Sequence, residues 1–303
     1  LVDARKGVLE QTIRHTYIAS LLDIRHIVFC INKMDLTGYS EEVYMKHCDD
    51  LRKLGESLGT EDLHFIPISA KYGDNVVVQS ENMKWYRGKT FLRLIETIEI
   101  RKDKNNGPAR FPVQTVIRPL SSDYHDYRGY AGRIASGSFH AGDKVTILPS
   151  GIESRISSIT VMGKILDRAE AGDSVTLNLS DQIDISRGDM IVKSGEIPES
   201  GMDIDLMVCW FNEKPLIPGR KLLVRNNTHE TSCMIKSINY RMNISKLEKE
   251  TSGLDISMND IANISIRTSK PLFYDSYKKN NITGSMIFIE EGTNETVGAG
   301  MIC

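Results

Sequence analysis

Two short polar strings have the residue types that could recognise a guanine base: Asn32-Lys33-Met34-Asp35 and Ser69-Ala70-Lys71. Guanine presents N1–H and an exocyclic amino group side by side, and the Asp35 carboxylate can accept both hydrogen bonds at once. Charge-assisted bonds of this kind contribute roughly 1.5–3 kcal/mol each. Because adenine lacks this pair of donors, Asp35 would select the base as well as bind it.

The neighbouring residues can complete such a site. Asn32 can join adjacent loops and reach the base, and the methylene stem of Lys33 can lie over the flat ring. The backbone N–H of Ala70 can donate to guanine O6, while Ser69 supports the loop. We predict no catalytic residue and no metal ligand in the chain, and the predicted GTP-binding residues are Asn32, Lys33, Met34, Asp35, Ser69, Ala70 and Lys71.

Both strings follow short apolar runs of the kind that form buried parallel strands, at residues 27–31 and 65–68. A helix is predicted between them, with Ser40 as its N-cap and Gly59 at its end. Its apolar face carries Val43, His47, Leu51, Leu54 and Leu58. Both motifs are therefore predicted at the carboxyl ends of parallel strands, where α/β sheets bind ligands. The alternative is a pair of polar turns without function.

The sequence lacks the phosphate loop G-x-x-x-x-G-K-[S/T] that accompanies these motifs in a GTPase. Gly88-Lys89-Thr90 matches only its end, because Met83 stands where the first glycine is required. We interpret Thr90 as the N-cap of a helix from Phe91 to Ile98, which would bury Phe91, Leu94, Ile95 and Ile98.

The first residues, Leu1-Val2-Asp3-Ala4, have the pattern of a strand end and run into a helix. We therefore expect a piece of a longer protein, in which residues 1–104 form a partial GTPase domain without phosphate loop or switches. Such a sheet would leave one strand edge unpaired. Residues 1–303 alone are expected to be inactive as a GTPase.

Composition restricts the class of protein. The net charge of −2 over 303 residues gives no general basic field, which disfavours nucleic acid as a partner. No apolar run is long enough to cross a membrane. The five cysteines form no C-x-x-C pair and the seven histidines no H-x-x-H or H-x-H pattern. A reduced, cytoplasmic location is predicted.

The composition changes at Lys102 to Pro108, a predicted linker. Short alternating runs follow, including residues 113–117, 144–148 and 174–179, separated by recurring Gly-Asp turns. This pattern is typical of closed β-barrels. We predict α/β plus all-β architecture: the C-terminal part of a P-loop GTPase domain, then barrels at residues 109–198 and 202–303.

Several strings resemble a known family. Gly73-Asp74-Asn75-Val76 and Asn82-Met83-Lys84-Trp85-Tyr86 are similar to the branch of translation elongation factor GTPases that contains elongation factor 1A. Within it, the chain most resembles the large, GTPase subunit of bacterial sulfate adenylyltransferase. The strings that carry this resemblance are Asp126-Tyr127-Arg128-Gly129-Tyr130-Ala131-Gly132, Asp184-Ile185-Ser186-Arg187-Gly188-Asp189, Pro215-Leu216-Ile217-Pro218-Gly219-Arg220 and Asn281-Ile282-Thr283-Gly284.

The resemblance implies a heterodimeric enzyme that joins ATP and sulfate into adenosine 5′-phosphosulfate and pyrophosphate, in sulfate assimilation. In that family the small partner subunit performs adenylyl transfer, and the large subunit hydrolyses GTP, with Mg²⁺, to drive it. An alternative is an elongation factor 1A/Tu-like GTPase that delivers aminoacyl-tRNA, with barrels that bind RNA. A third possibility is a fragment that binds nothing.

Overall fold

A computed structural model describes residues 1–60, 62–99, 107–119 and 127–303. The chain divides into two compact units. The first comprises residues 1–101 with 243–248, and the second comprises residues 102–242 with 249–303. The greater part of the predicted linker, residues 102–106, lies outside the described residues. The division into domains at 1–104, 109–198 and 202–303 stays a prediction.

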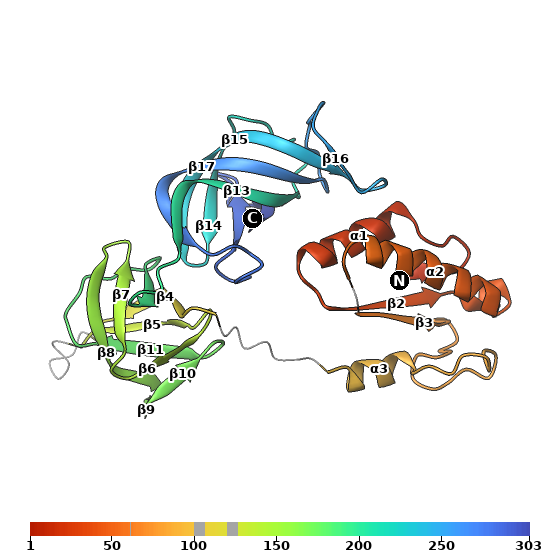
Figure 1. Ribbon diagram of the computed structural model, residues 1–303, viewed down its shortest axis with the longest axis horizontal. Coiled ribbons are helices and arrows are strands. Elements are labelled where there is room, and N and C mark those ends of the chain that lie inside the picture. The colour runs from red at the N-terminus through yellow and green to blue at the C-terminus, as the bar shows by residue number, and fades with distance from the viewer. Residues whose placement is uncertain (61, 100–106, 120–126) are drawn as a thin grey trace. The chain divides into compact units, whose positions relative to one another are not determined.

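The first unit is built around a small parallel sheet in the order β1-β2-β3 (Figure 1). Val2 pairs with Ile31, and Ile31 pairs with Pro67, which aligns the carboxyl ends of the strands. The elements in chain order are β1 (Val2–Asp3), α1 (Glu10–Leu21), β2 (His26–Asn32), the short 3-10 helix η1 (Met34–Thr37), α2 (Glu41–Ser57), β3 (Asp62–Pro67) and α3 (Phe91–Thr97).

Alternate residues of the strands pack against different helices. Phe29 and Ile31 lie in a core with Leu51 of α2, whereas Cys30 and Ile66 pack with Leu94 of α3 on the opposite face. This alternation follows from the two-residue period of a strand. The numbers of paired residues in β2 and β3 differ by an even number. Odd-numbered residues of both strands therefore face α2, and even-numbered residues face α3.

Both predicted helix caps are present. Ser40 Oγ accepts a hydrogen bond from the Val43 N–H at the start of α2, and Thr90 Oγ1 accepts one from the Arg93 N–H at the start of α3. The predicted burial of Ile95 is wrong, because this side chain is 47% exposed. Helix α3 is only two turns long and packs on the sheet mainly through Leu94, and Ile95 lies outside the cluster that this contact forms.

The second unit begins with a closed antiparallel barrel. The strands run in the order β11-β5-β4-β12-β7-β8, and pairing of β11 with β8 closes the ring, while β9 extends β8 as a hairpin. Phe111, Tyr130 and Phe139 are fully or almost fully buried inside. The strands are β4 (Arg110–Ile117), β5 (Gly129–Arg133), β6 (Ser138–His140), β7 (Lys144–Leu148), β8 (Ile152–Val161), β9 (Lys164–Leu166), β10 (Arg168–Glu170), β11 (Ser174–Leu179) and β12 (Met190–Lys193).

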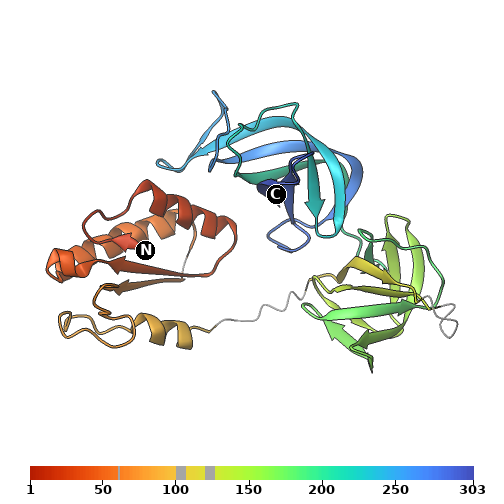
Figure 2. The same cartoon turned by 180° about the vertical axis from the view of Figure 1, so that it is seen from behind.

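A second antiparallel barrel follows, in the order β14-β18-β19-β13-β17-β15, closed by pairing of β14 with β15 (Figure 2). Its core contains Leu206, Trp210 and Phe288. A Cβ atom at Gly300 would lie 2.4 Å from Leu206 Cδ1, so any larger residue there would force this buried side chain to move. The strands are β13 (Glu199–Trp210), β14 (Lys221–Asn226), β15 (His229–Asn243), β16 (Glu248–Glu250), β17 (Ile261–Tyr274), β18 (Ser285–Ile289) and β19 (Thr296–Ile302). The predicted fold class is confirmed.

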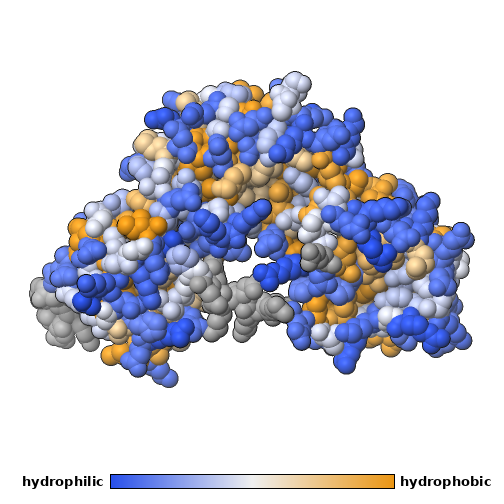
Figure 3. Space-filling view, in the orientation of Figure 1, coloured by the Kyte–Doolittle hydropathy of each residue, from blue (hydrophilic) through white to orange (hydrophobic). Residues whose placement is uncertain are grey.

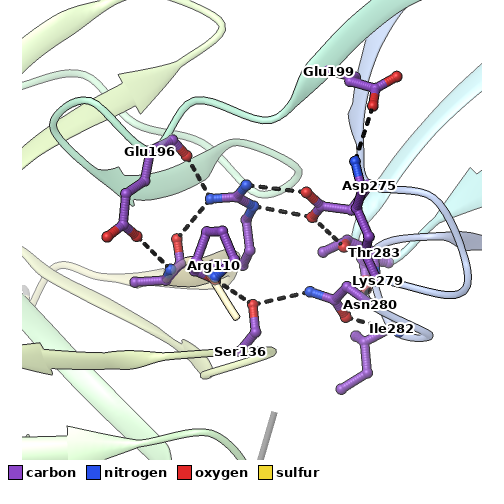
Figure 4. A network of polar contacts seen from close by, with 12 residues as sticks. Arg110, Ser136, Glu196, Glu199, Asp275, Lys279, Asn280, Ile282 and Thr283 are labelled. Atoms are coloured by element: carbon purple, nitrogen blue, oxygen red, sulfur yellow. Dashed lines mark hydrogen bonds and ion pairs between the residues drawn. The ribbon is translucent and has the colours of Figure 1, made fainter. Parts of the chain in front are cut away.

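A polar network joins the two barrels (Figure 4). Arg110, at the start of β4, donates from Nε and Nη2 to the two carboxylate oxygens of Asp275, at 3.0 Å each. Thr283 Oγ1 donates to the same carboxylate at 2.6 Å, and Asn280 Nδ2 donates to Ser136 Oγ at 2.9 Å. The barrels are therefore linked by a bidentate, charge-assisted pair of hydrogen bonds between a guanidinium and a carboxylate.

The visible surface of both units is a mixture of polar residues and scattered apolar ones (Figure 3). Such scattering is usual for a folded protein in water. Among the described residues, no helix is long and apolar enough to cross a membrane.

Candidate functional site

The two predicted motifs meet at the carboxyl edge of the parallel sheet. Asn32 ends β2, and Ser69 follows β3 by two residues. The Ile68 N–H donates to the Ile31 carbonyl at 2.8 Å, and the Met34 N–H donates to the Ile68 carbonyl at 3.2 Å. These bonds continue the sheet beyond its last regular pair, so the two loops leave it side by side.

Asn32 connects the two loops directly. Its Oδ1 accepts hydrogen bonds from the Lys33 N–H at 2.8 Å and from the Ala70 N–H at 3.0 Å. The Ala70 N–H, which we predict to donate to guanine O6, thus already donates to Asn32. A base could receive this bond if the N–H is shared with Asn32 or if the Asn32 amide turns. The contact with O6 stays a prediction.

The Asp35 carboxylate is held in position by the side chain of Ser69. Ser69 Oγ donates to Asp35 Oδ1 at 2.7 Å, and Ser69 is fully buried. In the described part of the chain this is the only hydrogen bond found to the carboxylate, so Oδ2 keeps its acceptor capacity. A buried hydroxyl that orients an accessible carboxylate pre-organises it for a pair of ligand donors.

Lys33 is fixed at both its backbone and its ammonium group. Its backbone is left-handed, with φ 66° and ψ 35°, a conformation that non-glycine residues adopt rarely. Its Nζ donates to Asp3 Oδ2 at 2.8 Å. The Arg5 guanidinium, and then the Lys33 ammonium, hold the pKa of the Asp3 carboxyl well below its usual value. No motif in the sequence indicates this role for Asp3.

The loop after Ser69 has its own internal scaffold. Asp74 accepts hydrogen bonds from Tyr39 Oη at 3.2 Å and from Ser80 Oγ at 2.5 Å. The buried Asn75 donates from Nδ2 to the Pro67 carbonyl at 2.9 Å. In the sequence, Asp74 and Asn75 only mark a family resemblance; here they hold the loop that carries Ser69 and Ala70.

Two predicted site residues differ in what they can offer. The Met34 side chain is fully buried in the core of the first unit, so it can support the loop but cannot reach a nucleotide. Lys71 is exposed, and its Nζ lies 4.8 Å from the centre of the Tyr72 ring. Interaction with Tyr72 raises the pKa of the Lys71 ammonium. It remains charged and available at the rim of the site.

Three family models match successive parts of the chain. Residues 1–118 match the elongation factor Tu GTP binding domain, and residues 130–192 match elongation factor Tu domain 2. Residues 203–303 match the GTP-eEF1A C-terminal domain-like family. Together these matches follow the order in which the structure places the parallel sheet and the two barrels.

Full-length alignments with curated proteins add a closer relation. The bifunctional enzyme CysN/CysC of Rhodopirellula baltica is 43% identical over 100% of this chain and 46% of its own length. Sulfate adenylyltransferase subunit 1 of Salmonella paratyphi C is 42% identical, and that of Alteromonas mediterranea 43%, with 62% and 63% of their lengths covered. The chain thus spans about half to just under two thirds of these relatives.

Solved structures support the fold alone. The structure of sup35 complexed with GMPPNP aligns with a TM-score of 0.59 at 20% identity, covering 100% of this chain and 76% of that one. The GDP complex of sup35 gives the same TM-score and identity. The fold, the three consecutive matches and the full-length alignments agree. The chain is therefore a homologue of sulfate adenylyltransferase subunit 1 over its full length, with parts that match the GTP binding domain and domain 2 of elongation factor Tu.

Proposed function

We propose that this chain supplies the guanine-recognition part and both barrels of the GTP-binding subunit of a sulfate adenylyltransferase. In this proposal, GTP hydrolysis drives the formation of adenosine 5′-phosphosulfate and pyrophosphate from ATP and sulfate. The proposed partner is a small catalytic subunit, which would carry the adenylyl transfer. A cytoplasmic location stays a prediction.

The observation that carries the proposal is the orientation of Asp35. Ser69 holds one carboxylate oxygen by a 2.7 Å hydrogen bond, while Asn32 joins the loops on either side. A carboxylate fixed in this way presents acceptors to two adjacent donors, which is the pattern of guanine and not of adenine. The same geometry supports Lys33 as the cover of the ring, since its ammonium is held by Asp3.

The phosphate end of the nucleotide receives no assignment in this chain. The sequence contains no G-x-x-x-x-G-K-[S/T] string. Such a loop supplies the backbone N–H groups and the lysine that bind phosphates, and the hydroxyl that binds Mg²⁺. We therefore propose Mg²⁺ only as the companion of the nucleotide phosphates and name no ligand for it. Purified residues 1–303 are expected to show no GTP turnover.

Asp35→Asn in the intact protein tests the base contact. The carbonyl oxygen of the new side-chain amide can still accept from Ser69, but its NH₂ group now offers a donor where guanine also has donors. Loss of two bonds of about 1.5 kcal/mol each predicts roughly a hundredfold weaker GDP binding. Xanthosine diphosphate, which has an oxygen at that position, should gain affinity. Fluorescent nucleotide titration measures both.

A matched control comes from the surface of α2. Asp49 makes an exposed ion pair with Arg52, so Asp49→Asn changes the same charge without touching the loops. Its GDP affinity should equal that of the wild type. Equal affinity of Asp35→Asn and wild type for both nucleotides would reject Asp35 as the base-reading residue.

The role of the whole subunit needs a separate assay. The intact protein should capture a small sulfurylase subunit, and the mixture should form adenosine 5′-phosphosulfate faster with GTP than without it. Capture of aminoacyl-tRNA alone, with no GTP-dependent product, would refute the proposed function and support the elongation factor alternative. The nucleotide titration above would stand in either case.

A further inference from the structure

Three potential metal ligands meet at the amino ends of β2 and β3. His26 and Asp62 are register partners on the neighbouring strands, and His64 follows Asp62 by two residues. Because side chains alternate across a strand, all three belong to one face of the sheet. This is the face on which Cys30 and Ile66 pack with α3. The strand register therefore brings together two histidines that are far apart in sequence.

The distances within this group are short. His26 Nδ1 lies 2.5 Å from Asp62 Oδ2, and His64 Nε2 lies 2.9 Å from Asp62 Oδ1. One ligand atom from each residue falls within 4.8 Å of the other two. Among the described residues, His64 Nε2 is buried and has no hydrogen-bond partner, although the carboxylate oxygen is so close. The two atoms thus approach each other without the angle that a hydrogen bond requires.

We propose that His26, Asp62 and His64 form a site for a divalent metal ion, and that the ion it binds is Zn²⁺. Two imidazole nitrogens and one carboxylate oxygen are a donor set that zinc accepts in proteins. A tetrahedral ion with bonds of about 2.1 Å needs its ligand atoms about 3.3 Å apart. Small side-chain rotations reach that spacing, because the Asp62 side chain is 45% exposed. The exposed side leaves room for a water as fourth ligand.

The metal would act on the fold and not on the nucleotide. His26 begins β2 and Asn32 ends it, so the two sites are separated by about 20 Å along the strand. A metal here would join the starts of β2 and β3, which the sheet pairing and the contact of His26 with Asp62 already hold together. Binding to the folded state alone stabilises that state by mass action.

The test compares metal binding by the intact protein and by two variants, each of which removes one metal ligand. After chelator treatment, Zn²⁺ is titrated by calorimetry in the presence of excess Mg²⁺, which disfavours nitrogen ligands. Wild type should bind one equivalent more than His64→Gln and Asp62→Asn, or bind it at least tenfold more tightly. Zn²⁺ should raise the melting temperature of the wild type, and Co²⁺ should give the visible spectrum of a four-coordinate site. His15→Gln, at an exposed position of α1, is the matched control.

Three outcomes would overturn the proposal. The first is equal zinc stoichiometry and affinity in wild type and both variants. The second is an equal loss of binding in His15→Gln, which would indicate adventitious binding by surface histidines. The third is a Co²⁺ spectrum of a purely aqueous, six-coordinate ion. Circular dichroism of the metal-free variants checks folding, and if His64→Gln does not fold, Asp62→Asn decides the question.

Discussion

The link between the two barrels gives the most sharply defined prediction for stability. Replacing Asp275 by Asn keeps the size of the side chain and its ability to accept the 2.6 Å hydrogen bond from Thr283. It removes the charge opposite Arg110, and the Arg110 and Asp275 side chains are only 3% and 12% exposed. The substitution thus leaves a cation without its counter-charge in a nearly dry environment.

The magnitude follows from the two bonds and the burial. Arg110 donates twice to Asp275 at 3.0 Å, and charge-assisted bonds contribute about 1.5–3 kcal/mol each. Removal of one partner from a buried pair costs about 3–5 kcal/mol, because the remaining charge stays desolvated. We expect Asp275→Asn to lower the free energy of unfolding of the second unit by about 3 kcal/mol or more. Arg110→Met together with Asp275→Leu should cost much less than the sum of the single changes.

Urea unfolding followed by tryptophan fluorescence measures this effect. Trp210 is fully buried in the second barrel, and a Trp85→Phe background leaves it as the only tryptophan. Glu230→Gln is the control, since Glu230 also takes two bonds from an arginine, Arg225, but both side chains are exposed. Exposed pairs contribute about 0–1 kcal/mol. If Asp275→Asn and Glu230→Gln lower stability equally, the reasoning from burial is refuted.

Three further predictions concern the first unit and the cysteines. Ser69→Ala should weaken GDP binding about tenfold in fluorescence titration, since it releases Asp35 from a charge-assisted bond, and unchanged affinity would contradict this orienting role. The folded state lowers the pKa of Asp3, so its stabilisation is complete above the ordinary value of 3.8 and is lost as pH falls below it. Unfolding followed by Trp85 fluorescence should therefore show a steeper loss of stability below that pH for wild type than for Asp3→Asn; parallel curves would exclude the effect. Burial raises the pKa of Cys233 to about 12, so alkylation at pH 8 mapped by mass spectrometry should spare Cys233 until the protein unfolds.

Local patterns predicted the elements well where one signal determines the structure. The helix expected between Ser40 and Gly59 is found at Glu41–Ser57, and the runs at 144–148 and 174–179 coincide with β7 and β11. Helix caps, turns and the alternation of apolar residues depend on only a few neighbouring residues, so they can be recognised in the sequence. The exposed Ile95 shows the limit, because burial depends on which layer lies opposite.

Contacts between distant residues could not be predicted. The closure of each barrel depends on pairing of β11 with β8 and of β14 with β15, and no local pattern specifies these partners. Arg110 and Asp275 are separated by 165 residues. The grouping of His26 with Asp62 depends on strand register across 36 residues. The Asp62-Leu63-His64 string was the one available signal, since two such residues share a strand face.

The ion pair between Asp3 and Lys33 links strand β1 to the predicted guanine-binding loop. Asp3 ends β1, and its carboxylate holds the ammonium of Lys33, the residue predicted to cover the base. Any sliding of β1 along β2 must therefore either break this ion pair or drag the lysine side chain with it. The rate at which a bound guanine nucleotide is released would then depend on how β1 is aligned with β2.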